Sequence, residues 1–425
     1  MHILLLGSGG REHALAWKIE KSPLCKKLFI APGNAGTRLC GINVELNVLD
    51  FEAVKIFILE QSIDMVVAGP EEPLVRGMGD YLAQEVETAD VLFVGPRQKG
   101  ARLEGSKEFA KEFMNKYQIP TAAYQSFSTQ TYDEGVAFLH KLQPPYVLKA
   151  DGLAAGKGVV IVSSLDEAVS ALRNMLHDKA FGKASEKVVI EEFLDGVEVS
   201  VFVATDGQSY IMLPEAKDYK RIGEKDTGLN TGGMGAVSPV WFADKDFMNK
   251  VETKIVKPTI EGLRKENIPY CGFLFLGLMN VKGEPYVVEY NVRLGDPETE
   301  VVVPRLMSDI VELMQHMARG TLKKYLPEIT PDFAVTAMLV SGGYPGQYEK
   351  GKEIRGLEQI SNSRVFFAGA QERNDKIYTS GGRVLAVTSI GNSLQGAISK
   401  TMENAGKIEF EKKYFRKDIG QDLLR

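Results

Sequence analysis

Residues 147–162 read VLKADGLAAGKGVVIV, which is an apolar run, a glycine-rich segment and a second apolar run. The β-branched character of the second run favours a strand, so the stretch predicts two strands joined by a loop. Glycines permit the tight bends in which backbone N–H groups turn toward an anion, and neighbouring lysines add positive charge. The residues concerned are Lys149, Gly152, Gly156, Lys157 and Gly158. We therefore expect a phosphate-binding loop, and a plain hairpin turn is the alternative.

This loop does not match the P-loop motif. A P-loop has four residues between its first glycine and its Gly-Lys pair, then a Ser or Thr, and then a helix. Here three residues separate Gly152 from Gly156, Gly158 follows Lys157, and a strand is predicted next. The spacing therefore favours a glycine-rich hairpin over a Walker-type loop.

The composition indicates a globular enzyme of several domains. A chain of 425 residues is too long for one ordinary core and suggests about three domains. The net charge of −5, without a basic stripe, gives no reason to expect a nucleic-acid partner, and no apolar stretch is long enough to span a bilayer. Cys25, Cys40 and Cys271 lack the spacing of a disulfide framework or a zinc site. We expect a cytoplasmic enzyme without a membrane anchor.

The N-terminal segment has the pattern of a ligand-binding strand, turn and helix. The apolar residues 2–6 precede GSGGREH and a helical pattern, and the N-terminus of a helix attracts anions. Glu12 stands where a dinucleotide fingerprint has its third glycine, and the next predicted strand, 28–31, leads into PGNAG instead of an acidic residue. We therefore expect a smaller phosphorylated ligand instead of NAD.

Strands predicted over 64–68 and 91–94 alternate with helical patterns, which indicates a parallel sheet with ligands beyond the carboxyl ends of its strands. Asn34 and Glu71 lie at such ends. Helices follow from residue 96, and short strands after residue 120 indicate a small inserted unit, with one strand expected over 188–194.

Two adjacent strands are predicted over 273–281 and 285–290, joined by a turn at Lys282-Gly283, and the second leads to a candidate pair of metal ligands. Glu289 and Asn291 are two residues apart and share one face of a strand, where a carboxylate and a carboxamide could hold Mg²⁺. The charged, glycine-rich stretch 215–235 reads as a long functional loop. The strand-rich region after residue 327 shows no cluster that demands chemistry, so we expect a scaffold or a wall of the site.

Eight motifs in fixed order identify a family. They are GSGGREHALAW, PGNAG, GPEEPLV, LEGSK, VLKADGLAAGKGV, EEFLDGVEVS, KDTGLNTGGMGA and EYNVRLGDPE. Together they resemble the phosphoribosylamine–glycine ligases, which are ATP-grasp enzymes, and the resemblance covers essentially the whole chain. KDTGLNTGGMGA and NVRLGDPE, joined to the N-terminal motif, are specific, whereas several of the others are generic to ATP-grasp proteins.

The resemblance implies an α/β fold, α+β in parts, with four domains. These are an N-terminal parallel-sheet preATP-grasp domain over 1–103, a central ATP-grasp domain over 104–121 and 193–326, an inserted lid domain over 122–192, and a C-terminal β-rich domain over 327–425. It also implies the ligation of glycine to 5-phosphoribosylamine in purine biosynthesis, through glycyl phosphate. ATP would be the co-substrate, Mg²⁺ or Mn²⁺ the metal, small molecules the only partners, and the chain a monomer.

Roles for individual residues follow from the same resemblance. ATP binding would fall to Lys107, Lys149, Gly152, Gly156, Lys157, Gly158, Glu191, Phe193, Leu194 and Glu198. The metal ligands would be Glu289 and Asn291, and the catalytic residues Arg293, Lys149, Asp218, Lys220 and Asp296. Substrate binding would involve Gly9, Gly10, Asn34, Glu71, Arg293 and Asp296, with Glu298 beside them.

The chain departs from the family pattern in two places. Many relatives read Gln-Asp-His-Lys-Arg where residues 217–221 read Lys-Asp-Tyr-Lys-Arg, which excludes an imidazole role there. Many ATP-grasp enzymes carry an acidic metal ligand on the preceding strand, and residues 273–279 contain none.

Two alternatives stay open. A purine-pathway carboxylase or formate-using transformylase of the same fold would couple ADP formation to bicarbonate or formate. A regulatory nucleotide-binding protein would show no glycine-dependent turnover, but Lys149, Glu289, Asn291 and Arg293 argue against it.

Overall fold

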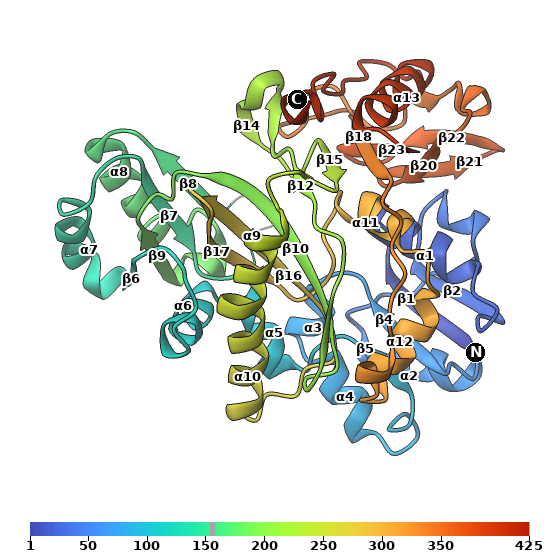
Figure 1. Ribbon diagram of the computed structural model, residues 1–425, viewed down its shortest axis with the longest axis horizontal. Helices are drawn as coiled ribbons and strands as arrows, with labels where there is room; N and C mark the ends of the chain where they lie inside the picture. The colour runs from blue at the N-terminus through green and yellow to red at the C-terminus, as the bar shows by residue number, and fades with distance from the viewer. Residues whose placement is uncertain (154–157, 425) are drawn as a thin grey trace.

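The computed structural model describes residues 1–153 and 158–424, and Figure 1 shows how its units are arranged. The N-terminal unit is a five-stranded sheet in the order β3-β2-β1-β4-β5 in which every neighbouring pair is parallel, as predicted. Its strands are β1 (His2–Gly7), β2 (Lys27–Pro32), β3 (Ile42–Asn43), β4 (Met65–Ala68) and β5 (Leu92–Val94). The helices between them are α1 (Gly10–Glu20), α2 (Phe51–Glu60), α3 (Glu72–Val75) and α4 (Met78–Gln84).

The central unit is a four-stranded antiparallel sheet in the order β11-β10-β16-β17. The strands predicted over 273–281 and 285–290 are confirmed as β16 and β17, and Lys282-Gly283 lies between them. Helices pass along one face of the sheet (Figure 1) and pack beside β17. The strands are β10 (Val197–Thr205), β11 (Tyr210–Met212), β16 (Gly272–Val281) and β17 (Glu284–Asn291), and the helices are α5 (Gln98–Gly105), α6 (Lys107–Lys116), α9 (Lys245–Val251) and α10 (Lys257–Lys265).

The inserted unit lies at the left of Figure 1 and is a four-stranded sheet in the order β6-β9-β7-β8. The predicted hairpin is confirmed, because β7 and β8 pair antiparallel with Lys149 opposite Val159. Leu148 and Ile190 are buried under two helices, so the alternate residues Val147 and Lys149 lie on the opposite face. The elements are β6 (Tyr124–Ser128), α7 (Tyr132–Leu139), β7 (Tyr146–Ala150), β8 (Val159–Val162), α8 (Leu165–Leu176) and β9 (Lys187–Glu191).

The C-terminal unit contains a five-stranded sheet in the order β12-β15-β18-β23-β20 and a three-stranded sheet in the order β19-β22-β21. Its first sheet consists of β12 (Lys217–Asp218), β15 (Gly235–Ser238), β18 (Phe333–Val340), β20 (Arg364–Phe367) and β23 (Arg383–Gly391). The second consists of β19 (Glu353–Ile354), β21 (Ala370–Arg373) and β22 (Lys376–Thr379). The helices α11 (Thr299–Arg305) and α12 (Ile310–Ala318) lie in the chain between β17 and β18, and α13 (Leu394–Lys407) follows β23.

The stretch 215–235 differs from the predicted long loop. It contains β12, the hairpin β13 (Arg221–Gly223) to β14 (Thr227–Asn230), and the start of β15. The C-terminal tail holds this hairpin, because the buried Arg416 guanidinium lies 2.6 Å from an Asp226 oxygen and 2.7 Å from an Asp418 oxygen. Because β12 and β15 pair into the C-terminal sheet, a domain division at residue 327 separates strands of one sheet.

Within the described ranges, no helix combines the length and the apolar character that crossing a bilayer requires.

Candidate nucleotide and substrate site

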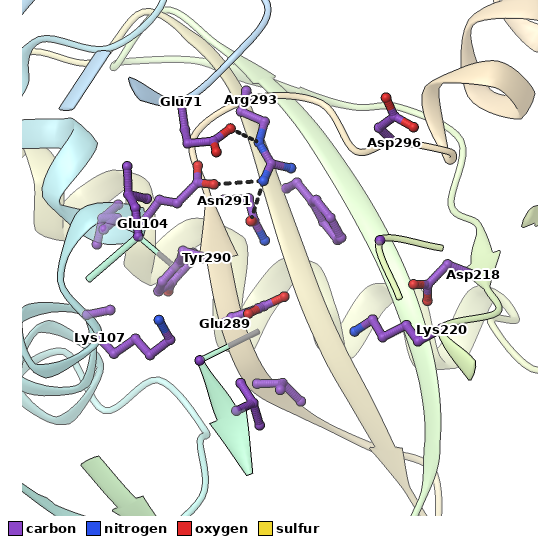
Figure 2. A pocket seen from close by; sticks show the side chains of 18 of the residues that line it. Glu71, Glu104, Lys107, Asp218, Lys220, Glu289, Tyr290, Asn291, Arg293 and Asp296 are labelled. Atoms are coloured by element: carbon purple, nitrogen blue, oxygen red, sulfur yellow. Dashed lines mark hydrogen bonds and ion pairs between the residues drawn. The ribbon is translucent and has the colours of Figure 1, made fainter. Parts of the chain in front are cut away.

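Two adjoining cavities form one cleft where the units meet. We call the first, of about 410 Å³, the charged cavity; its lining includes Arg11, Glu71, Glu104, Lys107, Arg293, Asp296 and Arg383. We call the second, of about 540 Å³, the apolar cavity; its lining includes Val147, Ile161, Phe193, Leu194, Val197 and Met279. The two cavities share Val159, Glu191, Asp218, Lys220, Thr231, Val288 and Glu289, and Figure 2 shows several of the shared and charged side chains.

The apolar cavity lies between the inserted sheet and the central sheet. Val147 and Ile161 come from the hairpin, and Met279 comes from β16 on the other side. The strand predicted over 188–194 is shorter than expected, since β9 ends at Glu191. Phe193 and Leu194 therefore lie outside the strand, and within the described chain their backbone N–H and C=O groups make no hydrogen bond. An apolar slot with a free backbone edge suits a planar nucleobase.

A buried lysine of the hairpin reaches the central sheet at the junction of the two cavities. The Lys149 ammonium lies 3.0 Å from Glu191 Oε1 and donates to the Val288 carbonyl oxygen at 3.1 Å. The pairing of β16 with β17 shifts register at this point, with Glu289 opposite Gly277 and Val287 opposite Leu278. The shift takes Val288 out of the ladder, which is the effect of a β-bulge.

The predicted metal pair sits at the end of β17, where both side chains line the charged cavity. Gly277 leaves room for Glu289, because a Cβ on that glycine would stand 3.1 Å from Glu289 Cγ. Burial works to raise the pKa of Glu289, but the Lys220, Lys149 and Lys107 ammoniums outweigh it and lower the pKa. The carboxylate is therefore ionised at neutral pH.

This pair fits a hard divalent cation. Among the described residues, the Glu289 carboxylate makes no hydrogen bond or ion pair, and the buried Asn291 amide nitrogen has no partner. Asn291 Oδ1 accepts from Arg293 at 3.0 Å. An ionised carboxylate and a neighbouring carboxamide oxygen are donors that Mg²⁺ and Mn²⁺ accept.

Arg293 is held by three side-chain acceptors around the charged cavity (Figure 2). Its guanidinium lies 2.8 Å from Glu104 Oε1, 3.3 Å from Glu71 Oε2 and 3.0 Å from Asn291 Oδ1. Glu104 also accepts from the Val292 N–H at 2.7 Å. Burial works to raise the pKa of Glu71, but the Arg293 and Arg11 guanidiniums outweigh it and lower the pKa. Arg293 is thus fixed in orientation before any ligand binds.

Acidic and basic groups face each other on the remaining walls. Lys220 forms an ion pair with Glu198, and the buried Ser200 hydroxyl donates to Glu298 Oε1 at 3.0 Å. Burial raises the pKa of Asp218 well above its ordinary value, and burial also raises the pKa of Glu298. These carboxyl groups hold protons more readily than ordinary surface carboxyls do.

The N-terminal motif lies beside the charged cavity. The Gly9 N–H donates to Glu12 Oε2 at 2.6 Å, and a Cβ on Gly9 would stand 3.0 Å from Asp296 Oδ2. The Asn34 side chain closes a turn, and its predicted contact with substrate stays a prediction. Its amide nitrogen donates to the Phe367 carbonyl at 2.6 Å, and its oxygen accepts from the Gly36 N–H at 2.8 Å. Asn34 therefore joins the N-terminal unit to β20.

The ends of the glycine-rich loop lie at the cleft. Lys107 donates to the Gly152 carbonyl at 3.0 Å, and the Gly158 carbonyl accepts from the Ala150 N–H at 2.8 Å. The predictions for Gly156 and Lys157 lie outside the described residues.

Four charged residues that line the charged cavity were not predicted. They are Arg11, Glu104, Lys111 and Arg383. Arg383 belongs to the C-terminal unit, where no chemical cluster was expected, and its guanidinium lies 3.0 Å from Asp296 Oδ1. Arg11 and Glu104 belong to the motifs GGREH and LEGSK, so their charge inside a motif was an available signal. Arg383 had no such signal, because only the fold brings it to Asp296.

The fold and the site together define an ATP-grasp enzyme. It has a parallel-sheet unit, a central antiparallel sheet that ends in Glu289 and Asn291, and an inserted sheet that carries Lys149. Three family models match the chain: phosphoribosylglycinamide synthetase N domain at residues 1–104, its ATP-grasp (A) domain at 105–299 and its C domain at 334–422. The chain belongs to the phosphoribosylglycinamide synthetase family.

Individual relatives agree with this family. The chain is 43% identical over 424 residues to a phosphoribosylamine–glycine ligase of Fusobacterium nucleatum, covering 99% of this chain and 98% of the relative. A ligase of the same name from Thermotoga maritima has a solved structure with a TM-score of 0.86 and 38% identity, covering 99% of this chain and 100% of that one. The biotin carboxylase domain of a Hydrogenobacter thermophilus 2-oxoglutarate carboxylase, at 17% identity and a TM-score of 0.72, covers 99% of this chain and 97% of its own and shares the fold alone.

Proposed function

We propose that this chain joins glycine to 5-phosphoribosylamine, giving glycinamide ribonucleotide, ADP and phosphate in purine biosynthesis. Full-length similarity to ligases of that name and the match to all three family models support this reaction. The observation that carries the proposal within the molecule is the cleft itself. An apolar slot opens directly into a cavity that holds an ionised carboxylate, a fixed arginine and several ammonium groups.

ATP would lie across the two cavities. Its base would occupy the apolar cavity, where the free backbone groups of Phe193 and Leu194 can bond the base edge. Glu198, beside Lys220, would take the ribose hydroxyls. The phosphates would then point toward Lys107 and Lys149, with Gly152 and Gly158 above them.

Glu289 and Asn291 would hold Mg²⁺ or Mn²⁺ in this arrangement, since they are hard oxygen donors on one strand face. When bound, the cation neutralises charge that develops on the phosphates. Arg293, already fixed by Glu104 and Glu71, stands ready to stabilise the transferring phosphoryl group or the acyl phosphate.

The reaction would proceed in two transfers. A glycine carboxylate oxygen attacks the γ-phosphorus, the bond to ADP breaks, and glycyl phosphate forms. The amine of phosphoribosylamine then attacks the carbonyl carbon, a C–N bond forms, phosphate leaves, and the amine loses a proton. Asp218, Lys220 and Asp296 line the side where glycine and the amine would meet, with Gly9, Gly10 and Glu71 nearest the ribose phosphate.

Such a path needs charge neutralisation and exclusion of water more than a nucleophilic side chain. The cleft supplies the former through Lys107, Lys149, Lys220 and Arg293. Residues 122–192, with the hairpin at the cleft, would act as a lid that limits water.

The chain would act as a monomer in the cytoplasm on small molecules alone. Its cysteines are free and partly buried, and burial raises the pKa of each thiol, which suits a reducing compartment. Sedimentation of the purified protein tests the monomer.

The reaction is tested by ADP release in the presence of Mg²⁺, with each substrate omitted in turn and phosphoribosylamine generated in the assay. We expect ADP release to require glycine. If ADP release does not depend on glycine but depends on bicarbonate or formate, the proposed reaction is wrong and the chain has the activity of another ATP-grasp enzyme.

A further inference from the structure

Lys111 is a buried lysine with no part in the reaction described above. It lies on α6, its side chain is 2% exposed, and its ammonium is 2.9 Å from Glu191 Oε2. It also donates to the Thr121 hydroxyl at 2.8 Å. The other oxygen of Glu191 lies 3.0 Å from the Lys149 ammonium. One buried carboxylate from β9 therefore bridges two buried lysines, one from the body of the molecule and one from the hairpin.

The charges in this triad do not cancel. Two ammonium groups and one carboxylate leave a net charge of one positive unit, and all three side chains are at most 5% exposed. Charges interact strongly where water is excluded. If Lys111 were neutral, Glu191 and Lys149 would form a closed pair of zero net charge. Lys149 would then offer little to an anion in the cleft.

We propose that Lys111 is a positioning residue that neutralises Glu191 and thereby leaves the charge of Lys149 available to the phosphates of the nucleotide. The inference rests on the proposed nucleotide site. It explains why a lysine on α6 is buried against the inserted sheet, where a hydrophobic side chain would fill the space at a lower desolvation cost.

Direct calorimetric binding of ATP and of adenosine tests this role. In Lys111→Met we expect ATP to bind at least about tenfold more weakly, the size of one lost charge-assisted interaction, and adenosine to bind as in the parent. Adenosine has the base and ribose but no phosphate, so a general disturbance of the cleft would weaken both ligands. The matched control is Lys116→Met, which removes the same charge from the same helix at a side chain that is 63% exposed.

Two further variants separate charge balance from packing. Lys111→Arg keeps the positive charge and should retain ATP affinity. The double variant Lys111→Met with Glu191→Gln removes both charges, frees Lys149 again and should recover most of the affinity lost in Lys111→Met.

The inference is overturned if the double variant binds ATP as weakly as Lys111→Met does, or if Lys111→Met binds ATP like the parent. If Lys111→Met fails to fold, the double variant alone decides, because it leaves no unpaired buried carboxylate. Failure of the parent itself to bind ATP would overturn the proposed function instead, so the two failures are distinguishable.

Discussion

The two halves of the cleft use different physical means to bind. The apolar cavity offers side chains such as Val147, Ile161 and Met279 and an unpaired stretch of backbone. The charged cavity offers groups that already pair with one another, as Arg293 does with Glu104 and Arg383 with Asp296. The first holds a ligand by shape, whereas the second is an electrostatic environment organised before the ligand arrives.

Because of this difference, substitutions in the apolar cavity should change the affinity for ATP, and substitutions in the charged cavity should change the rate of the chemical step. Shape binding stabilises substrate and transition state alike, so its loss raises KM, whereas preorganised charge acts where charge moves, so its loss lowers kcat. Substitutions on the two sides should therefore have distinct kinetic signatures.

The largest effect is expected for Glu289→Ala at the end of β17. Glu289 is the one ionised carboxylate of the charged cavity that has no partner among the described residues. Its removal should lower kcat by about 10²–10³-fold or more. Glycine-dependent ADP release gives kcat, and circular dichroism should show an unchanged fold. The control is Glu284→Ala, at the start of the same strand, where the carboxylate pairs with Lys250 and Lys254 at the surface. A Glu289→Ala enzyme of normal activity would assign the metal to another residue.

A smaller loss is expected for Arg383→Ala. It leaves the Asp296 carboxylate without its guanidinium beside the charged cavity, which should lower kcat/KM for glycine by about 10–100-fold. The KM for ATP should stay near the parent value, because Arg383 does not line the apolar cavity. Arg355→Ala, with a side chain that is 73% exposed, controls for loss of charge in the same unit. If Arg383→Ala raised only the KM for ATP, the charged cavity would act on ATP affinity as the apolar cavity does, and the proposed difference between them would be wrong.

The opposite signature is expected for Met279→Ala in the apolar cavity. Loss of apolar contact should raise the KM for ATP by about tenfold, a typical change for one truncated side chain in a pocket, and leave kcat unchanged. Steady-state kinetics at saturating glycine measures both constants. A fall in kcat with constant KM would show that Met279 acts on the chemistry instead.

The sequence predicted local features of this cleft well. The strand alternation indicated the parallel sheet, the two apolar runs indicated the hairpin, and the spacing of two put Glu289 and Asn291 on one face of β17. The role of this pair as metal ligands stays a prediction. Each of these three features depends on residues close together in the chain. Helix caps have the same short range, as at Ser106, whose hydroxyl accepts from the Phe109 N–H at 3.1 Å.

Features that depend on distant residues were not predictable in this way. Arg383 meets Asp296 across 87 positions of the chain, and Lys111 meets Glu191 across two units. The stretch 215–235 was read as a loop because its strands are too short to show a period, and β15 pairs with β18, which lies about a hundred positions further along the chain. The hydrogen bond from the Asn34 amide to the Phe367 carbonyl joins residues 333 positions apart and was not predicted either.

The smallest effect on catalysis is expected at His13, which belongs to the N-terminal motif but lies outside both cavities. Its Nδ1 accepts from the Phe367 N–H at 2.7 Å, and burial lowers its pKa from 6.5 to about 4. A protonated ring could not accept that bond. His13 takes up its proton near pH 6.5 in the unfolded chain and only near pH 4 in the folded one. The stability that the neutral ring contributes is therefore full above pH 6.5 and is lost as the pH falls toward 4.

The loss should reach about 3 kcal/mol of unfolding free energy, from the size of the pKa shift. Urea unfolding of the parent and of His13→Gln between pH 4 and 7 measures it, and the variant should have the flatter pH dependence. Its kcat and its KM for ATP at pH 7.5 should match the parent, because His13 joins α1 to β20 and faces neither half of the cleft. A kinetic defect of His13→Gln at pH 7.5 would show that α1 contributes to the chemistry of the charged cavity. An equal pH dependence of the unfolding free energy in both proteins would assign the acid sensitivity to another buried group.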